Sequence, residues 1–171
     1  MTELEHRILA AEGYIELGLH SEAREELSHL SPESAERADV IELIVLCSMG
    51  EQRWAEGLAL TQKLRELEPK EPGGYIHAAY CLHELGQTQE ALDLLARGPA
   101  TLRTKPVYYY NVGCYLACLG ENEKALQLLE QSFEMDGSLR DHARNDRDLD
   151  GLRQKLEKIG CTSPLHPPWT P

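Results

Sequence analysis

The sequence predicts an all-α fold of tandem helix pairs, and three observations support this prediction. Small and apolar residues recur at a 34-residue step through most of the 171-residue chain. Each step holds two stretches with the apolar spacing of a helix, joined by a turn that usually contains glycine. Acidic residues open the second stretch, where the helix dipole favours negative charge.

Five columns of residues keep this step without any insertion or deletion. One column holds only small residues, which let paired helices approach closely: Ala23, Gly57, Ala91 and Ala125. Glycine suits the left-handed conformation that ends a helix, and it fills the turn column except at Gln52. That turn column and the three remaining columns are Gly18, Gln52, Gly86 and Gly120; Ala10, Ile44, Ala78 and Val112; Ala11, Val45, Ala79 and Gly113; Leu27, Thr61, Leu95 and Leu129.

The columns predict four repeats, over residues 4–37, 38–71, 72–105 and 106–137, each a helix pair. Gly98 and Pro99 should end the second helix of the third repeat early, because proline cannot continue a helix. Pro106 suits the first position of the helix that follows.

The chain beyond the repeats is expected to form a capping helix within residues 138–160, ending at Gly160. Residues 161–171 are rich in proline and are expected to be extended or disordered. Four apolar residues of the capping helix recur at three- and four-residue spacing, so they form one stripe that covers the open end of the last repeat: Leu149, Leu152, Leu156 and Ile159.

Charge and composition exclude several classes of partner. The formal net charge is -12 and the pI is about 5.0, which argues against binding to nucleic acid or to an anionic membrane surface. No apolar run approaches the ~20 residues of a transmembrane helix, and Met1–Arg7 does not resemble a secretory signal. The five cysteines are odd in number and dispersed, so we expect reduced thiols and a cytoplasmic protein.

Two clusters contain residue types that metal binding or base stacking uses, and both have structural explanations. Cys114 and Cys118, like His77 and Cys81, lie one helical turn apart, which zinc accepts. The two pairs use different repeat positions and point in different directions, so we expect no metal site. The run Tyr108–Tyr110 cannot form one stacking platform, because consecutive helical residues diverge by about 100°.

The acidic stretch after the repeats also has a structural explanation. His142, Asp146, Asp148 and Asp150 match a turn and an N-cap that lead into the capping helix. The sequence contains no phosphate-binding glycine loop, nucleophile elbow or HExxH motif. We therefore expect no enzyme activity, no catalytic residue and no cofactor.

The repeat resembles the tetratricopeptide repeat (TPR) over residues 4–137. The fourth repeat matches the family pattern best, through Tyr109, Val112, Gly113, Gly120 and Ala125. The resemblance implies a right-handed superhelical solenoid with a capping helix. It also implies that the first helices line a concave groove that holds a peptide or a helix of another protein.

Family groove positions, transferred one by one, give a candidate binding surface. It is mostly apolar and aromatic, with acids toward the first two repeats. The chaperone-type carboxylate clamp is missing, since Ile8 and Glu12 stand where that clamp has Lys and Asn. Such residues could instead belong to the core or be covered by the chain's own tail. The candidates are Glu12, Glu42, Leu46, Ile76, Tyr80, His83, Tyr110 and Cys114.

The resulting functional hypothesis is a protein-interaction scaffold or adaptor whose partner is neutral to basic, or apolar. One alternative is a class II-like chaperone of type III secretion. The stretch "EPGGYIHAAYCLHELGQTQEA" resembles the third repeat of such chaperones. Another alternative is a structural scaffold that self-associates through an open repeat face or through the tail that carries Trp169.

Overall fold

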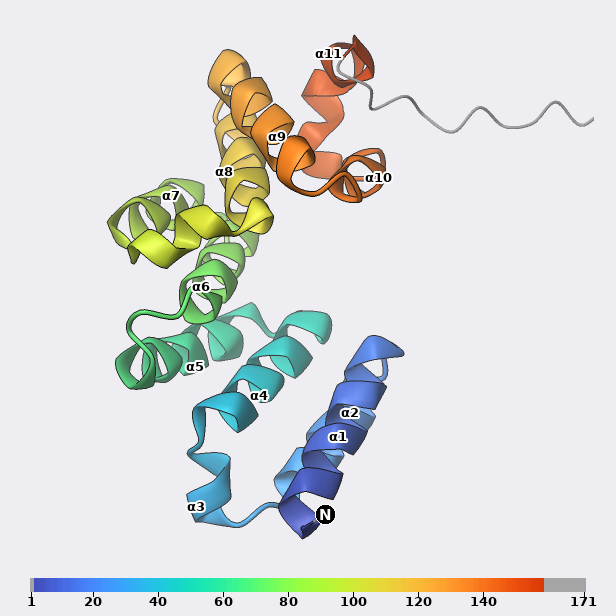
Figure 1. Ribbon diagram of the computed structural model, residues 1–171, viewed down its shortest axis with the longest axis vertical. Coiled ribbons are helices and arrows are strands. Elements are labelled where there is room, and N and C mark those ends of the chain that lie inside the picture. The colour runs from blue at the N-terminus through green and yellow to red at the C-terminus, as the bar shows by residue number, and fades with distance from the viewer. Residues whose placement is uncertain (1, 159–171) are drawn as a thin grey trace, which may run out of the picture. The chain divides into compact units, whose positions relative to one another are not determined.

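Figure 1 shows the computed structural model, which describes residues 2–158; every regular element in that range is a helix. The predicted all-α repeat fold is therefore confirmed, while the superhelical path stays a prediction. Ile159, Gly160 and the tail 161–171 lie outside the described residues. The elements are α1 (Glu3–Glu16), α2 (His20–Ser28), α3 (Pro32–Ala35), α4 (Ala38–Gly50), α5 (Trp54–Leu67), α6 (Gly73–Glu84), α7 (Thr88–Arg97), the 3-10 helix η1 (Ala100–Thr104), α8 (Pro106–Cys118), α9 (Asn122–Met135), α10 (Leu139–Ala143), the 3-10 helix η2 (Arg147–Leu152) and α11 (Arg153–Lys158).

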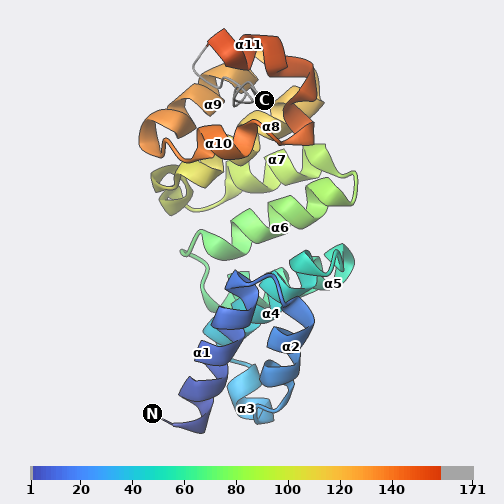
Figure 2. The ribbon, with the colours of Figure 1, turned by 90° about the vertical axis from the view of Figure 1, so that its right-hand side faces the viewer.

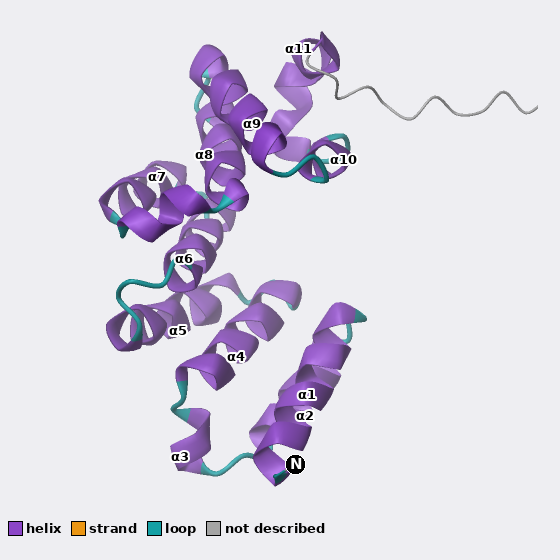
Figure 3. Cartoon of the chain, in the orientation of Figure 1, coloured by secondary structure: helices purple, strands orange, loops and turns teal. Residues whose placement is uncertain are grey.

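The chain divides into an N-terminal unit, Met1–Leu102, and a C-terminal unit, Arg103–Pro171. The N-terminal unit contains the helix pairs α1–α2, α4–α5 and α6–α7, which the loops in Figure 3 connect. The turns end these helices as the sequence predicts, with φ of 73° at Gly18 and 80° at Gly86. Gln52 adopts the same left-handed conformation, with φ of 59°, although its Cβ makes that conformation unfavourable.

Successive pairs of the N-terminal unit share their cores. Helix α4 packs against α1, α2 and α5, and α5 packs against α6. The small-residue column lies where these helices meet: Ala23 and Ala91 are fully buried. A Cβ atom added to Gly57 would lie 3.1 Å from Cys81 Sγ on α6. The first and second pairs share one apolar cluster, which contains Ala11, Ala23, Leu27, Val40, Leu43 and Cys47.

A polar bridge also joins the first pair to the second. The Arg24 guanidinium on α2 lies 2.9 Å from a carboxylate oxygen of Glu51 and 2.9 Å from one of Glu56. It also donates to Ser48 Oγ over 3.0 Å. This bridge fixes α2 against the C-terminal end of α4 and the first turn of α5.

The C-terminal unit contains the pair α8–α9 and the segment after it, α10, η2 and α11, which we call the cap (Figure 2). The sequence predicts one capping helix, whereas the structure has three short helical segments. Arg153 bridges two of them by donating to the backbone oxygens of Ala143 and Asp146, each over 2.5 Å. The predicted stripe is buried over its described part, at Leu149, Leu152 and Leu156.

No helix among residues 2–158 combines the length and the apolar character that crossing a bilayer requires.

Candidate protein-binding face

Six of the eight candidate residues lie on neighbouring first helices of the N-terminal unit. One of them is exposed and five are partly exposed. Helix α1 packs against α4, and α4 packs against α6. We call the candidate residues on these three helices, together with Ile8, Ile15, Glu16 and Met49 on the same helices, the N-terminal face. Glu12 on α1 is exposed, and the side chains of α4 and α6 are partly exposed: Glu42, Leu46, Ile76, Tyr80 and His83.

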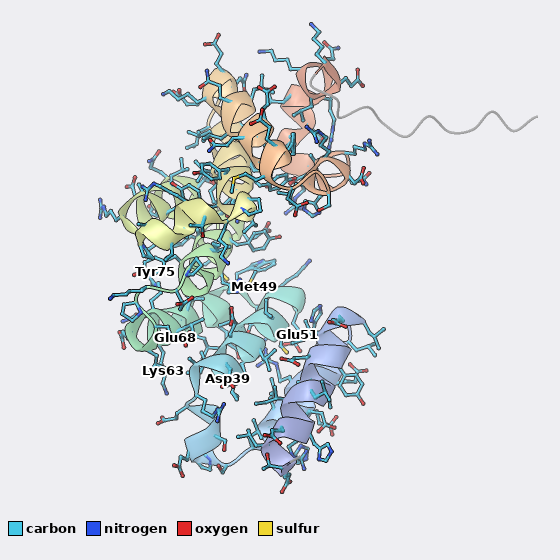
Figure 4. All side chains as sticks on the ribbon, in the orientation of Figure 1. Asp39, Met49, Glu51, Lys63, Glu68 and Tyr75 are labelled. Atoms are coloured by element: carbon cyan, nitrogen blue, oxygen red, sulfur yellow. The ribbon has the colours of Figure 1, made fainter. Side chains whose placement is uncertain are left out.

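The apolar residues of this face rest on the core and still reach the surface. Ile8, Ile15 and Leu46 pack against the cluster shared by the first two pairs, and each keeps part of its surface exposed. Met49, near the C-terminal end of α4 in Figure 4, packs against the next cluster in the same way. Their positions are therefore fixed by packing while some apolar surface stays free.

Tyr80 is the aromatic residue of this face. Its ring meets the edge of Trp54, the first residue of α5, with ring centroids 5.7 Å apart and planes at 66°. Edge-to-face geometry is favourable for aromatic pairs. The contact fixes the orientation of Tyr80, which is a useful property for a side chain that anchors a ligand.

The charges on the N-terminal face are acidic toward α1. Glu42 Oε1 lies 3.2 Å from His77 Nε2, and this hydrogen bond holds the pKa of Glu42 below its ordinary value. Gly73 at the start of α6 leaves room for this carboxylate, since an added Cβ would come within 2.7 Å of Oε1. Glu12 and Glu16 have no ion-pair partner within residues 2–158. Both carboxylates are thus free to meet a cation from outside.

The C-terminal unit corrects the sequence-based prediction at two residues. Tyr110 is 4% exposed and Cys114 is 3% exposed, so neither lines an open groove. The cap covers them: the Tyr110 hydroxyl donates to Asp146 Oδ2 over 2.7 Å, and the Cys114 thiol points to the same oxygen at 3.6 Å. Burial raises the pKa of both side chains, which keeps both protonated and able to donate.

Asp146 is the residue that covers Tyr110 and Cys114, and the sequence does not predict this contact. It caps η2 as predicted, since its Oδ1 accepts the backbone N–H of Asp148 over 3.0 Å. Its Oδ2 accepts the hydrogen bond from Tyr110 on α8, which lies 36 residues earlier in the sequence. The N-cap signal is local and therefore could not reveal this distant contact.

A shallow depression of ≈ 340 Å³ lies between α6 and α7. The repeat pattern does not predict this depression, because its lining combines residues from both helices of the third repeat. Tyr75, labelled in Figure 4, forms one wall, and Arg65 lies over the Tyr75 ring at 5.6 Å. The lining residues are Tyr75, Leu82, Glu90, Asp93, Leu94 and Arg97.

The buried thiols of Cys47 and Cys81 are poorly suited to act as nucleophiles or metal ligands. Burial raises the pKa of Cys81 to about 11 and that of Cys47 to about 11. The thiolate is the nucleophile and the metal ligand, so these two side chains are largely inert near neutral pH. His77, which the spacing pairs with Cys81, hydrogen-bonds to Glu42 instead.

Comparison with known proteins agrees with this geometry. The sequence profile described as "Tetratricopeptide repeat" matches residues 48–112, from the end of α4 into α8. This part of the chain therefore matches the TPR family. The solved structure "MamA 41-end from Desulfovibrio magneticus RS-1" is similar to this chain with a TM-score of 0.67 and 12% identity, covering 93% of this chain and 90% of that one. That likeness shows the fold. A search of curated proteins found no match.

Proposed function

We propose that this TPR protein is a non-enzymatic scaffold or adaptor that binds a peptide or a helix of a partner protein on its N-terminal face. One observation carries the proposal: partly exposed apolar and aromatic side chains lie on three adjacent first helices, with Ile8 and Ile15 on α1, Leu46 and Met49 on α4, and Ile76 and Tyr80 on α6. Contiguous apolar surface on a soluble protein marks interaction sites. Rigid aromatic residues such as Tyr80 supply much of the binding energy at such sites.

The charges of the face favour a neutral or basic partner segment. Glu12 and Glu16 on α1 have no ion-pair partner within residues 2–158, Glu42 on α4 has a lowered pKa, and the whole chain carries a net charge of -12. An acidic segment would meet like charge there, whereas a segment with Lys or Arg would gain attraction.

The cysteines support a cytoplasmic site of action as part of the same proposal. Cys47, Cys81, Cys114 and Cys118 are free thiols. Free thiols are typical of reducing compartments, because secreted proteins usually pair their cysteines.

Affinity capture in the native organism, followed by mass spectrometry, tests the proposal. The double variant Leu46→Ala/Tyr80→Ala removes apolar surface from the face. Its matched control, Leu67→Ala/Leu85→Ala, removes leucines that are 48% and 42% exposed at the ends of α5 and α6. We expect the double variant alone to lose partners that the unaltered chain captures, with a loss of affinity of at least ~10-fold per anchor removed.

Circular dichroism establishes that both variants are folded before capture is compared. Capture of the same proteins in the same amounts by the double variant and the unaltered chain would show that the N-terminal face is not the binding site. Equal losses for both double variants would point to a general effect of lost apolar surface and would also contradict the proposal.

A further inference from the structure

The α8 face, defined by Tyr110, Cys114 and Cys118, is occupied by the cap. Tyr110 and Cys114 stand at positions where the TPR resemblance places ligand contacts, and all three residues point a hydrogen-bond donor at the cap. Tyr110 and Cys114 meet the carboxylate of Asp146, and the Cys118 thiol points to the backbone oxygen of Asp148 at 3.8 Å. The cap thus sits on α8 as a ligand segment would.

The chemistry of the α8 face selects an acidic residue rather than a basic one. Tyrosine hydroxyls and thiols that stay protonated are donors, and a carboxylate accepts from them. Within residues 2–158, Asp146 has no ion-pair partner, so its contacts with α8 are hydrogen bonds. Apolar burial then follows along the same segment, since Leu149 and Leu152 are 0% and 1% exposed.

The cap is built from pieces that do not hold their structure alone. Helix α10 has 5 residues, η2 has 6 and α11 has 6. Isolated helices of that length are unstable in water. The cap therefore owes its conformation to docking, which is the behaviour of a peptide that folds as it binds.

We infer that the α8 face is a binding surface for a segment of the form Asp-x-x-Leu-x-x-Leu, and that the chain fills it with its own residues 146–152. A tethered segment acts at an effective concentration on the order of millimolar. The docked cap therefore excludes a free segment of the same chemistry until the cap is weakened. This inference concerns a different surface and a different ligand charge from the proposed function, so either can fail alone.

Binding of the cap sequence, supplied as a separate peptide, to the full chain tests the inference. The probe is a fluorescein-labelled peptide with the sequence of residues 144–158, and the receptor is the full chain with Asp146→Ala and Leu149→Ala. These changes weaken the receptor's own cap and leave α8 intact. We expect the peptide to bind this receptor at least ~10-fold more tightly than it binds the unaltered chain, measured by fluorescence anisotropy.

Two matched changes separate recognition from unspecific association. An Asp146→Asn change in the peptide and a Tyr110→Phe change in the receptor should each weaken binding by roughly 10-fold or more, since hydrogen bonds to a charged group carry ~1.5–3 kcal/mol. Unchanged affinity for the Asn peptide, or no saturable binding to a receptor that circular dichroism shows to be helical, would overturn the inference.

If the Asp146→Ala/Leu149→Ala receptor does not fold, the alkylation rate of the Cys114 thiol tests the inference instead. In the single variant Asp146→Ala, which loosens the cap and keeps every donor of the α8 face, the rate of Cys114 alkylation by N-ethylmaleimide is followed by mass spectrometry. Cys81, also buried but in the N-terminal unit, is the internal reference. We expect faster alkylation of Cys114 alone and a return toward the unaltered rate when the free peptide is added. Absence of peptide protection would refute the inference, because a purely structural cap would loosen without accepting a substitute.

Discussion

Gly113 offers a direct test of how tightly α8 and α9 pack. The residue is buried at the contact between the two helices, and a Cβ atom added there would lie 2.8 Å from Leu129 Cγ and 3.2 Å from the backbone oxygen of Ala125. Leu129 is fully buried, so it has no space to move into. Overpacking of this kind costs about 1–3 kcal/mol, and replacing a helical glycine by alanine returns about 0.5–1 kcal/mol. Taking the middle of each range, Gly113→Ala should therefore destabilise the chain by about 1 kcal/mol net.

Gly13 provides the matched control on α1, because a Cβ atom added there meets nothing within 4 Å. Gly13→Ala should stabilise the chain by about 0.5–1 kcal/mol through helix propensity alone. Thermal unfolding followed by circular dichroism measures both changes, at about 4–8 °C in Tm per kcal/mol for units of this size. A Tm for Gly113→Ala equal to or above that of the unaltered chain would show that the α8–α9 contact is looser than described here.

Two further predictions concern a turn and an ion pair. Gln52→Gly should raise the stability of the chain by up to about 1 kcal/mol, because the left-handed conformation at φ of 59° suits glycine; an unchanged or lower urea midpoint would contradict this. Glu42 has a pKa below its ordinary value of 4.5 in the folded chain because of its hydrogen bond with His77. Its stabilising effect should be complete above that ordinary value and should fade as the pH falls through the lower, folded value. Glu42→Gln should flatten this part of the profile of urea midpoint against pH, between about pH 6 and pH 3; parallel profiles for both chains would refute it.

The repeat is readable from sequence because packing between paired helices depends on local periodicity and on residue size. Ala23, Ala91 and Ala125 are each fully buried, as their column predicts. The turns follow from single residues in the same way, and even the exception at Gln52 keeps the left-handed backbone. A 34-residue step thus fixes the helices, their turns and the contact within each pair.

The candidate face is less predictable, because exposure depends on neighbours that the repeat pattern does not encode. Ile76 and Tyr110 occupy equivalent positions one step apart, yet the first is partly exposed and the second is buried. Part of the cover over Tyr110 comes from the cap, which lies outside the repeats: Asp146 accepts from the Tyr110 hydroxyl and the His142 ring lies 5.4 Å from the Tyr110 ring. The capping stripe predicts burial of Leu149 but gives no information about which helix face the turn before it will cover.

Under the two proposals above, the N-terminal face and the α8 face prefer opposite charges, and that difference would give the cap its specificity. A segment that begins with Asp146 finds donors on α8, at Tyr110 and Cys114. The same segment on the N-terminal face would meet the free carboxylate of Glu12 and the ionised Glu42, which repel it. An acidic cap is therefore compatible with the last repeat and unfavourable on the earlier ones. If both proposals hold, this repulsion leaves the N-terminal face open for a basic or apolar partner while the cap occupies the α8 face, so a single chain binds its own segment and stays available for another.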